Sequence, residues 1–140
     1  MAEESTRSDL VVRTRRVWET ADVPDFDGMM SYFGSHPIWD MSSMGLGVYQ
    51  GFTAVRRFFE EWRGAYEEYA TEPEEIVEAS DGVIFAVFLQ KGRPVGSVGQ
   101  VRIHYAAVVF WTEGLINRIT IYTDIAEARA AAERHAEERE

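Results

Sequence analysis

The chain has 140 residues, of which 46% are hydrophobic and 13% aromatic, enough for one domain with a single well-filled core. Its formal net charge of −10 makes nucleic acid and anionic membranes poor partners, and the absence of cysteine excludes disulfides and thiolate chemistry. No segment approaches about 18 uninterrupted apolar residues, and the N-terminus lacks a signal-peptide pattern. We therefore predict a single cytoplasmic domain over residues 1–140.

Apolar periodicity indicates three helices in the first half of the chain. The first covers residues 10–22, with Ser8 as its candidate N-cap, and the second covers residues 24–34, from a proline to a glycine. The third follows Gly51, and its apolar stripe consists of Val55, Phe58, Phe59, Trp62, Tyr66 and Tyr69.

The second half alternates apolar and polar residues and is rich in β-branched side chains, which indicates strands. Short turns between consecutive strands predict an antiparallel meander, and the Ala/Glu/Arg-rich segment 126–138 predicts a last helix that lies outside or frays. The fold class is therefore α+β: a cone-shaped, curved antiparallel sheet whose concave face is covered by three N-terminal helices, with a cavity where they diverge. The predicted strands are Ile38–Met41, Glu75–Ala79, Val83–Gln90, Val98–Trp111 and Leu115–Tyr122.

This order of elements resembles the nuclear transport factor 2-like superfamily, and within it the SnoaL-like polyketide cyclase and ketosteroid isomerase branch. The resemblance covers residues 8–132 or so and implies the cystatin-like α+β barrel that this superfamily shares. The superfamily contains isomerases, cyclases, dehydratases, epoxide hydrolases and binding modules, so the fold alone names no reaction. The motifs that carry the resemblance are Trp39-Asp40, Val48-Tyr49-Gln50-Gly51, Asp81-Gly82, and Thr112–Ile119 with Tyr122 and Asp124.

Asp40 is the candidate general base. It ends an apolar stretch, where a carboxylate tends to have a raised pKa, and the resemblance places it at the base position of the isomerase pattern. That pattern also needs a Tyr and a protonated Asp as oxyanion donors, and these positions fall near Val17 and Ala106, which disfavours a strict steroid isomerase. The alternative is a structural Asp40 that caps a turn or pairs with an arginine.

His104 is the second catalytic candidate. If Ala106 points into the cavity, the two-residue period of a strand makes His104 and Arg102 point there too, where they can stabilise a developing oxyanion. The alternatives are a hydrogen-bonded histidine near the sheet edge and an arginine in an ion pair.

Seven side chains are predicted to contact a substrate, although each can instead belong to the core or the cavity wall. No His-x-His or similar spacing supports a metal site, and we expect neither metal nor cofactor. The predicted substrate-binding residues are Trp39, Tyr32, Trp62, Tyr49, Met44, Arg102 and Tyr122.

Two classes of function follow. The first is a small acid–base enzyme, an isomerase, cyclase or dehydratase, that acts on an apolar carbonyl-bearing molecule with Asp40 as base. The second is a non-catalytic module of the same fold that binds a hydrophobic ligand or a protein. An epoxide hydrolase is less favoured because its last-strand Asp would fall at Ile121. Sheet faces of this kind often pair two copies, so a homodimer is expected.

Overall fold

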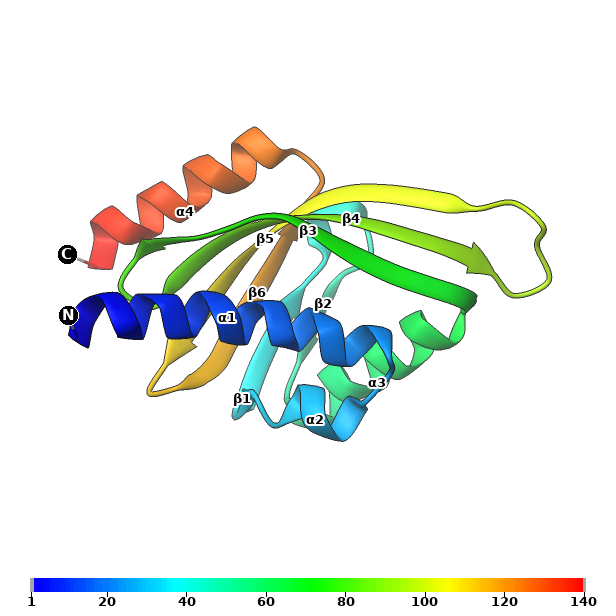
Figure 1. Cartoon of the computed structure of the whole chain (residues 1–140), viewed down its shortest axis with the longest axis horizontal. Helices are drawn as coiled ribbons and strands as arrows, with labels where there is room; N and C mark the ends of the chain where they lie inside the picture. The colour runs from blue at the N-terminus through cyan, green and yellow to red at the C-terminus, as the bar shows by residue number, and fades with distance from the viewer. Residues whose placement is uncertain (1, 140) are drawn as a thin grey trace.

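The computed structural model describes residues 2–139, and side-chain environments for residues 9–134. Three helices and two strands precede a run of four consecutive strands, and a fourth helix closes the chain (Figure 1). The elements are α1 (Ala2–Asp22), α2 (Phe26–Met30), β1 (Phe33–Asp40), the short 3₁₀ turn η1 (Ser42–Met44), β2 (Val48–Gln50), α3 (Phe52–Gly64), β3 (Tyr66–Ser80), β4 (Val83–Pro94), β5 (Val101–Thr112), β6 (Leu115–Tyr122) and α4 (Ile125–Arg139).

The strands form one open, curved sheet in the order β2-β1-β6-β5-β4-β3. The predicted meander from β3 to β6 is confirmed, because each consecutive pair is antiparallel. The sheet is mixed rather than purely antiparallel, since β1 runs parallel to β6. This pairing joins strands that are far apart in the sequence, so no short turn between them indicates it.

Several element boundaries differ from the prediction; among the strands, β1 begins at Phe33 rather than Ile38, β3 at Tyr66 rather than Glu75 and β5 at Val101 rather than Val98. Helix α1 begins at Ala2, before the expected N-cap Ser8, whose side chain lies outside the described residues. Helix α2 ends at Met30, because Phe33 already pairs with β6. Tyr66 and Tyr69 belong to β3, where pairing with β4 overrides the helical spacing that links them to the stripe of α3.

Both faces of the central strands are buried, which explains their nearly continuous apolar sequence. Helices α1, α2 and α3 pack on the inner face, and α4 covers part of the outer face (Figure 1). Helix α4 therefore lies outside the cone, as predicted, and it is anchored through Ala128, Ala131 and Ala132, all buried. The outer cluster under α4 consists of Val83, Phe85, Val87, Ala106, Val108, Phe110, Ala128 and Ala132.

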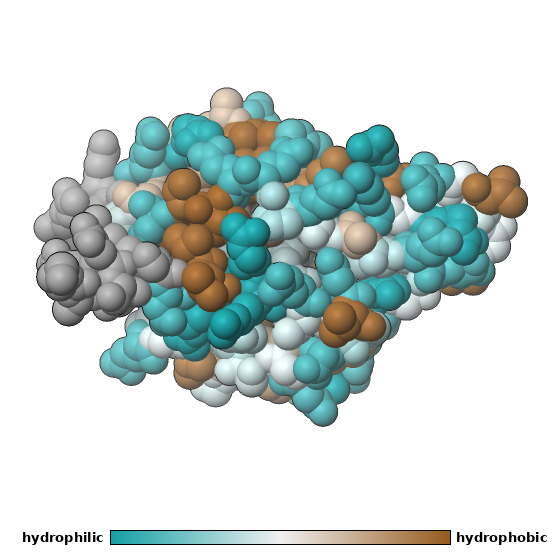
Figure 2. Space-filling view, in the orientation of Figure 1, coloured by the Kyte–Doolittle hydropathy of each residue, from teal (hydrophilic) through white to brown (hydrophobic). Residues whose placement is uncertain are grey.

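The hairpin between β4 and β5 extends beyond the body of the molecule (Figure 1), and its tip exposes Val95 and Val98. The rest of the surface in this orientation is mainly hydrophilic, with an extended apolar patch beside the residues drawn in grey and smaller apolar patches elsewhere (Figure 2). Between residues 2 and 139, no helix has both the length and the apolar character needed to cross a bilayer.

Candidate functional site

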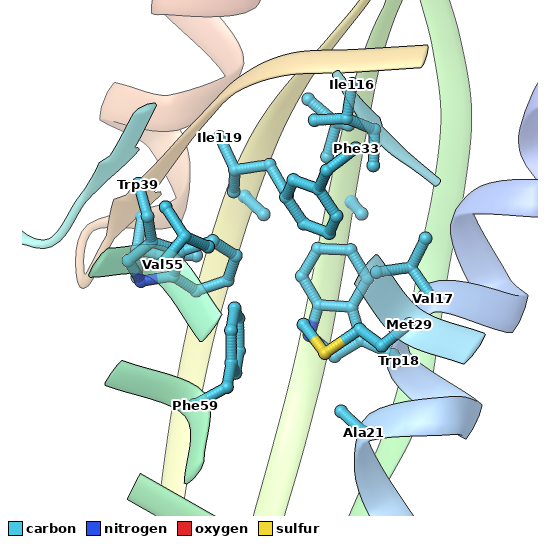
Figure 3. Packing of buried hydrophobic residues seen from close by; sticks show 14 of the residues in the cluster. Val17, Trp18, Ala21, Met29, Phe33, Trp39, Val55, Phe59, Ile116 and Ile119 are labelled. Carbon is cyan, nitrogen blue, oxygen red and sulfur yellow. The ribbon is translucent and has the colours of Figure 1, made fainter. Parts of the chain in front are cut away.

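A cavity lies between the three N-terminal helices and the inner face of the sheet, and part of its wall is drawn in Figure 3. None of the described side chains that line it is Asp, Glu, His, Lys or Arg. Its polar groups are two phenols, an amide and the indole nitrogens of the tryptophans. The lining residues are Val17, Trp18, Ala21, Met29, Trp39, Met41, Met44, Phe58, Phe59, Trp62, Tyr69, Gln90, Ile103, Tyr105 and Ile121.

The cavity is narrow. Its volume, measured for the centre of a water-sized sphere, is about 30 Å³. One water molecule needs roughly 10–15 Å³ on this measure, so the space exceeds that of a single water. A ligand larger than a small ring therefore requires side chains to move, and the thioethers of Met41 and Met44 are the flexible part of the wall.

Gln90 organises a group of polar side chains at one end of the cavity. Its side-chain oxygen accepts hydrogen bonds from the Tyr69 hydroxyl at 3.0 Å and from Trp62 Nε1 at 3.3 Å. Its amide nitrogen donates to the Tyr66 hydroxyl at 3.4 Å. Gln90 is only 2% exposed, so these bonds offset the cost of burying an amide.

Tyr105 carries the second polar group. Trp18 Nε1 donates to its hydroxyl oxygen at 2.7 Å, and both side chains are buried. Among the described residues, no acceptor takes the proton of the Tyr105 hydroxyl. That proton is therefore available to an oxygen or nitrogen acceptor that enters the cavity.

The two phenols are neutral at physiological pH. Burial raises the pKa of Tyr69 to about 12, and burial likewise raises the pKa of Tyr105 well above its ordinary value. A neutral phenol donates a hydrogen bond but does not accept a proton from a carbon acid. The cavity wall thus contains hydrogen-bond donors, and none of its described side chains is a general base.

Asp22, which we did not predict as a site residue, is the carboxylate next to this wall. It ends α1 beside Ala21, and its two carboxylate oxygens accept hydrogen bonds from the Thr71 amide at 2.9 Å and the Thr71 hydroxyl at 3.0 Å. Burial raises the pKa of Asp22 despite these bonds, and its charge in turn raises the pKa values of Tyr69 and Tyr105. Polar residues at the end of an amphipathic helix usually face solvent, so no local pattern indicated that Asp22 lies beside the cavity.

The expectation that Asp40 lies in the cavity is wrong. Trp39 and Met41 line the cavity, and the alternation of strand β1 turns Asp40 to the opposite face of the sheet. Its carboxylate accepts hydrogen bonds from the Ser42 hydroxyl at 2.6 Å, the Ser42 amide at 2.9 Å and Arg118 at 2.8 Å. This arrangement matches the alternative interpretation, in which Asp40 is structural, caps a turn and pairs with an arginine.

The pKa of Asp40 moves in the direction opposite to the one predicted. Partial burial opposes ionisation, but the hydrogen bonds from Ser42 and the charge of Arg118 outweigh it and lower the pKa. A carboxylate with a lowered pKa is a weaker base. The geometry of Asp40 therefore favours a role in the stability of the β1–β6 pair.

We expect Asp40→Asn to lower the free energy of unfolding by about 1–3 kcal/mol near pH 7, since it removes charge-assisted hydrogen bonds. Because the folded-state pKa is lowered, the carboxylate stabilises the fold above its unfolded pKa, near 3.8, and loses this effect as pH falls through the folded pKa. Urea unfolding of both proteins at pH 7 and below pH 3.8 tests this. A stability difference that stays constant or grows toward low pH would contradict it.

His104 and Arg102 also lie outside the cavity. Ala106 belongs to the outer cluster under α4, so the even-numbered residues of β5 face outward and the odd-numbered Ile103 and Tyr105 face inward. His104 is exposed and its Nε2 pairs with Glu74 on β3, while Arg102 is exposed. Asp40 and His104 therefore share no pocket.

Of the predicted substrate-binding residues, Trp39, Trp62 and Met44 line the cavity. Tyr32 packs edge to face against Trp111 and beneath Arg13. The Tyr49 ring lies 4.5 Å from that of Phe58 at a tilt of 36°, and its hydroxyl donates to the Leu46 carbonyl, while Tyr122 packs against the outer cluster. These three tyrosines are part of the framework rather than of the lining.

The lining residues that we did not predict include Tyr69, Gln90 and Tyr105. The polar–apolar alternation of Arg102, Ile103, His104 and Tyr105 was the signal that places Tyr105 inside, because the two charged residues are the ones expected outside. Within the described residues, His, Asp and Glu side chains form no group of three or more suited to a metal ion.

Comparison with known proteins identifies the fold of the chain but does not identify a reaction. No protein-family model and no curated protein sequence matches the chain. Solved structures do match. The epoxide hydrolase/cyclase-like enzyme SalBIII, which has a role in pyran ring formation in the polyether salinomycin, superposes with a TM-score of 0.71 at 20% identity, over 87% of this chain and 93% of that one.

Two further structures have the same fold. RV0760c from Mycobacterium tuberculosis, in complex with estradiol-17beta-hemisuccinate, matches with a TM-score of 0.68 at 17% identity, over 79% of this chain and 90% of that one. A putative polyketide cyclase from Sinorhizobium meliloti matches with a TM-score of 0.62 at 19% identity, over 74% and 87%.

The class that these likenesses define is the NTF2-like α+β cone, and the structural neighbours of the chain are SnoaL-like polyketide cyclases and ketosteroid isomerase-like proteins. The resemblance seen in the sequence is thereby confirmed at the level of fold.

Proposed function

We propose that this protein binds an uncharged, apolar organic molecule that carries a hydrogen-bond acceptor, within the cavity between its helices and sheet. One observation carries the proposal: the cavity wall combines apolar and aromatic side chains with neutral donors and, among the described residues, no charged group. Such a wall excludes ions, because an unpaired charge loses its hydration there. It favours flat apolar molecules, which stack on Trp18 and Phe58.

Tyr105 is the proposed donor to the ligand. Its hydroxyl accepts from Trp18 and keeps its own proton free, so a carbonyl or ether oxygen can complete the chain of hydrogen bonds. RV0760c, which has the same fold, is in complex with estradiol-17beta-hemisuccinate, and this supports a small organic ligand for the fold. The neutral character of the proposed ligand is argued from the cavity wall alone.

Calorimetric titration with two matched probes tests the proposal. Naphthalene and 1-tetralone have similar shape, but only 1-tetralone has a carbonyl oxygen. We expect both to bind and 1-tetralone to bind more tightly by roughly 2- to 10-fold, the effect of one hydrogen bond. Tyr105→Phe removes this preference while naphthalene binding is unchanged, and Asp40→Asn serves as the control that keeps it. Failure of both probes to bind the folded protein would refute the proposal.

A second candidate function is acid–base catalysis on a carbonyl compound, with Asp22 rather than Asp40 as the proton-transferring group. The raised pKa of Asp22 and its electrostatic coupling to both phenols favour it. Turnover of a panel of ketones, lactones and epoxides is the test. If Asp22 transfers the proton, Asp22→Asn lowers turnover by about 10²-fold or more, whereas Asp40→Asn retains the turnover of the wild type. If no compound of the panel is turned over, the catalytic candidate is refuted and ligand binding remains the proposed function of the cavity.

A further inference from the structure

The indole nitrogen of Trp39 is a buried donor without a partner. Trp39 is 4% exposed, its Nε1 is inaccessible to water, and no hydrogen-bond acceptor for it exists among the described residues. The other three tryptophans each have an acceptor: Tyr105 for Trp18, Tyr69 and Gln90 for Trp62, and Thr14 for Trp111. A buried N–H left unpaired is costly, so such a group in a cavity wall needs an explanation.

Trp39 lines the cavity, and we infer that its N–H donates to a second acceptor atom of the bound molecule. This inference rests on the proposed function and specifies its ligand class: a neutral, planar molecule with two acceptor oxygens. Tyr105 binds one oxygen and Trp39 binds the other. The charged groups that would suit an anionic or cationic ligand lie elsewhere.

The two donors stand well apart on the sheet. Trp39 pairs with Ile119 on β6, Ile119 pairs with Val109 on β5, and Tyr105 precedes Val109 by four residues on β5. Strands are about 4.8 Å apart and residues along them about 3.3 Å, so the two backbone positions are separated in both directions by roughly 10 Å or more. Donors at such separate positions cannot be replaced by one another, and they orient a ligand as well as hold it.

The ligand reaches Trp39 only after a neighbouring side chain moves, since the indole nitrogen is covered. Met44 is the candidate, because it lines the cavity, is partly exposed and lies in η1 directly before Gly45, which has a positive φ of 74°. A thioether changes rotamer at little cost. A change of the Met44 rotamer would therefore open the cavity from the side of η1.

The test adds a third probe, 1,4-naphthoquinone, whose two carbonyls are on opposite sides of the ring system; the chain has no cysteine to react with it. We expect it to bind roughly 2- to 10-fold more tightly than 1-tetralone. Trp39→Phe removes that difference, whereas Trp111→Phe, with its N–H outside the cavity, preserves it. Equal weakening of all three probes by Trp39→Phe would show that Trp39 contributes shape alone and would overturn the inference.

A measurement on the unaltered protein keeps the inference testable if Trp39→Phe does not fold. The four indole N–H groups give separate signals in a ¹H–¹⁵N NMR spectrum. We expect the Trp39 proton to move downfield on addition of 1,4-naphthoquinone and to stay in place with naphthalene, while the Trp111 proton stays in place with both. An unmoved Trp39 proton in a protein that binds the quinone would contradict the inference. The indole N–H would then be assigned to a contact with the face of the Phe59 ring, whose centroid lies 4.4 Å from that of Trp39 at an interplanar angle of 74°. Absence of binding by every probe would instead refute the proposed function.

Discussion

Replacing Phe88 by alanine is expected to lower the free energy of unfolding by about 3–5 kcal/mol, because this ring is fully buried and its removal leaves a void that the sheet cannot close. Phe88 stacks on Trp18 with ring centroids 4.4 Å apart and lies 5.7 Å from the ring of Tyr105. Phe88 therefore supports Trp18 and Tyr105, the hydrogen-bonded pair in the cavity wall. Chemical unfolding monitored by circular dichroism gives the stability.

Phe85→Ala is the matched control. Phe85 is equally buried but lies on the outer face of the same strand, under α4 and beneath Arg129. We expect a similar loss of stability with 1-tetralone affinity unchanged, whereas Phe88→Ala also weakens 1-tetralone because Trp18 and Tyr105 lose their support. Two results would contradict the view that only the inner face of β4 supports the cavity. One is a Phe88→Ala protein whose free energy of unfolding is within about 1 kcal/mol of that of the wild type. The other is equal 1-tetralone affinity in Phe88→Ala and Phe85→Ala.

Ala21→Leu is expected to reduce the affinity for naphthalene and 1-tetralone by roughly 10-fold or more, because a leucine and the ligand together overpack the cavity, which costs about 1–3 kcal/mol. Ala21 lies on α1, is 8% exposed and lines the cavity, so a larger side chain there occupies the space that the ligand needs. Calorimetric titration with both probes measures the effect.

Ala126→Leu makes the same change at an exposed position of α4 and should leave both affinities unaltered. Both variants keep good helix formers, so their far-ultraviolet spectra should match that of the wild type. Undiminished binding by Ala21→Leu would place the ligand somewhere other than this cavity.

Local patterns in the sequence predict much of the fold. The spacing of apolar residues located α1 and α3, and the turn signals located β4, β5 and β6, because each depends on neighbours close in the chain. The parallel pairing of β1 with β6 joins distant segments, and the strand character of Tyr66 and Tyr69 arises from long-range pairing with β4. Propensity carries no information about such contacts.

The candidate site was harder to predict than the fold. Which face of a strand points inward changes with a shift of one residue, so a count that placed Ala106 inside also placed Arg102 and His104 on the wrong side. Asp40, on β1, was placed inside by its apolar neighbours and by the isomerase pattern instead. Both faces of β5 near Ala106 are apolar because α4 covers the outer one, and this hides the alternation. Trp39, Trp62 and Met44, which were chosen for chemical type and for their position in the chain, do line the cavity.

A crystal structure of the protein with 1-tetralone tests the central claim most directly. The account predicts the ring system between α1, α3 and the sheet, in contact with Trp18 and Phe58, with its carbonyl oxygen about 2.6–3.0 Å from the Tyr105 hydroxyl. A ligand bound on the outer face beside Asp40 and Arg118, with the inner cavity empty, would contradict it.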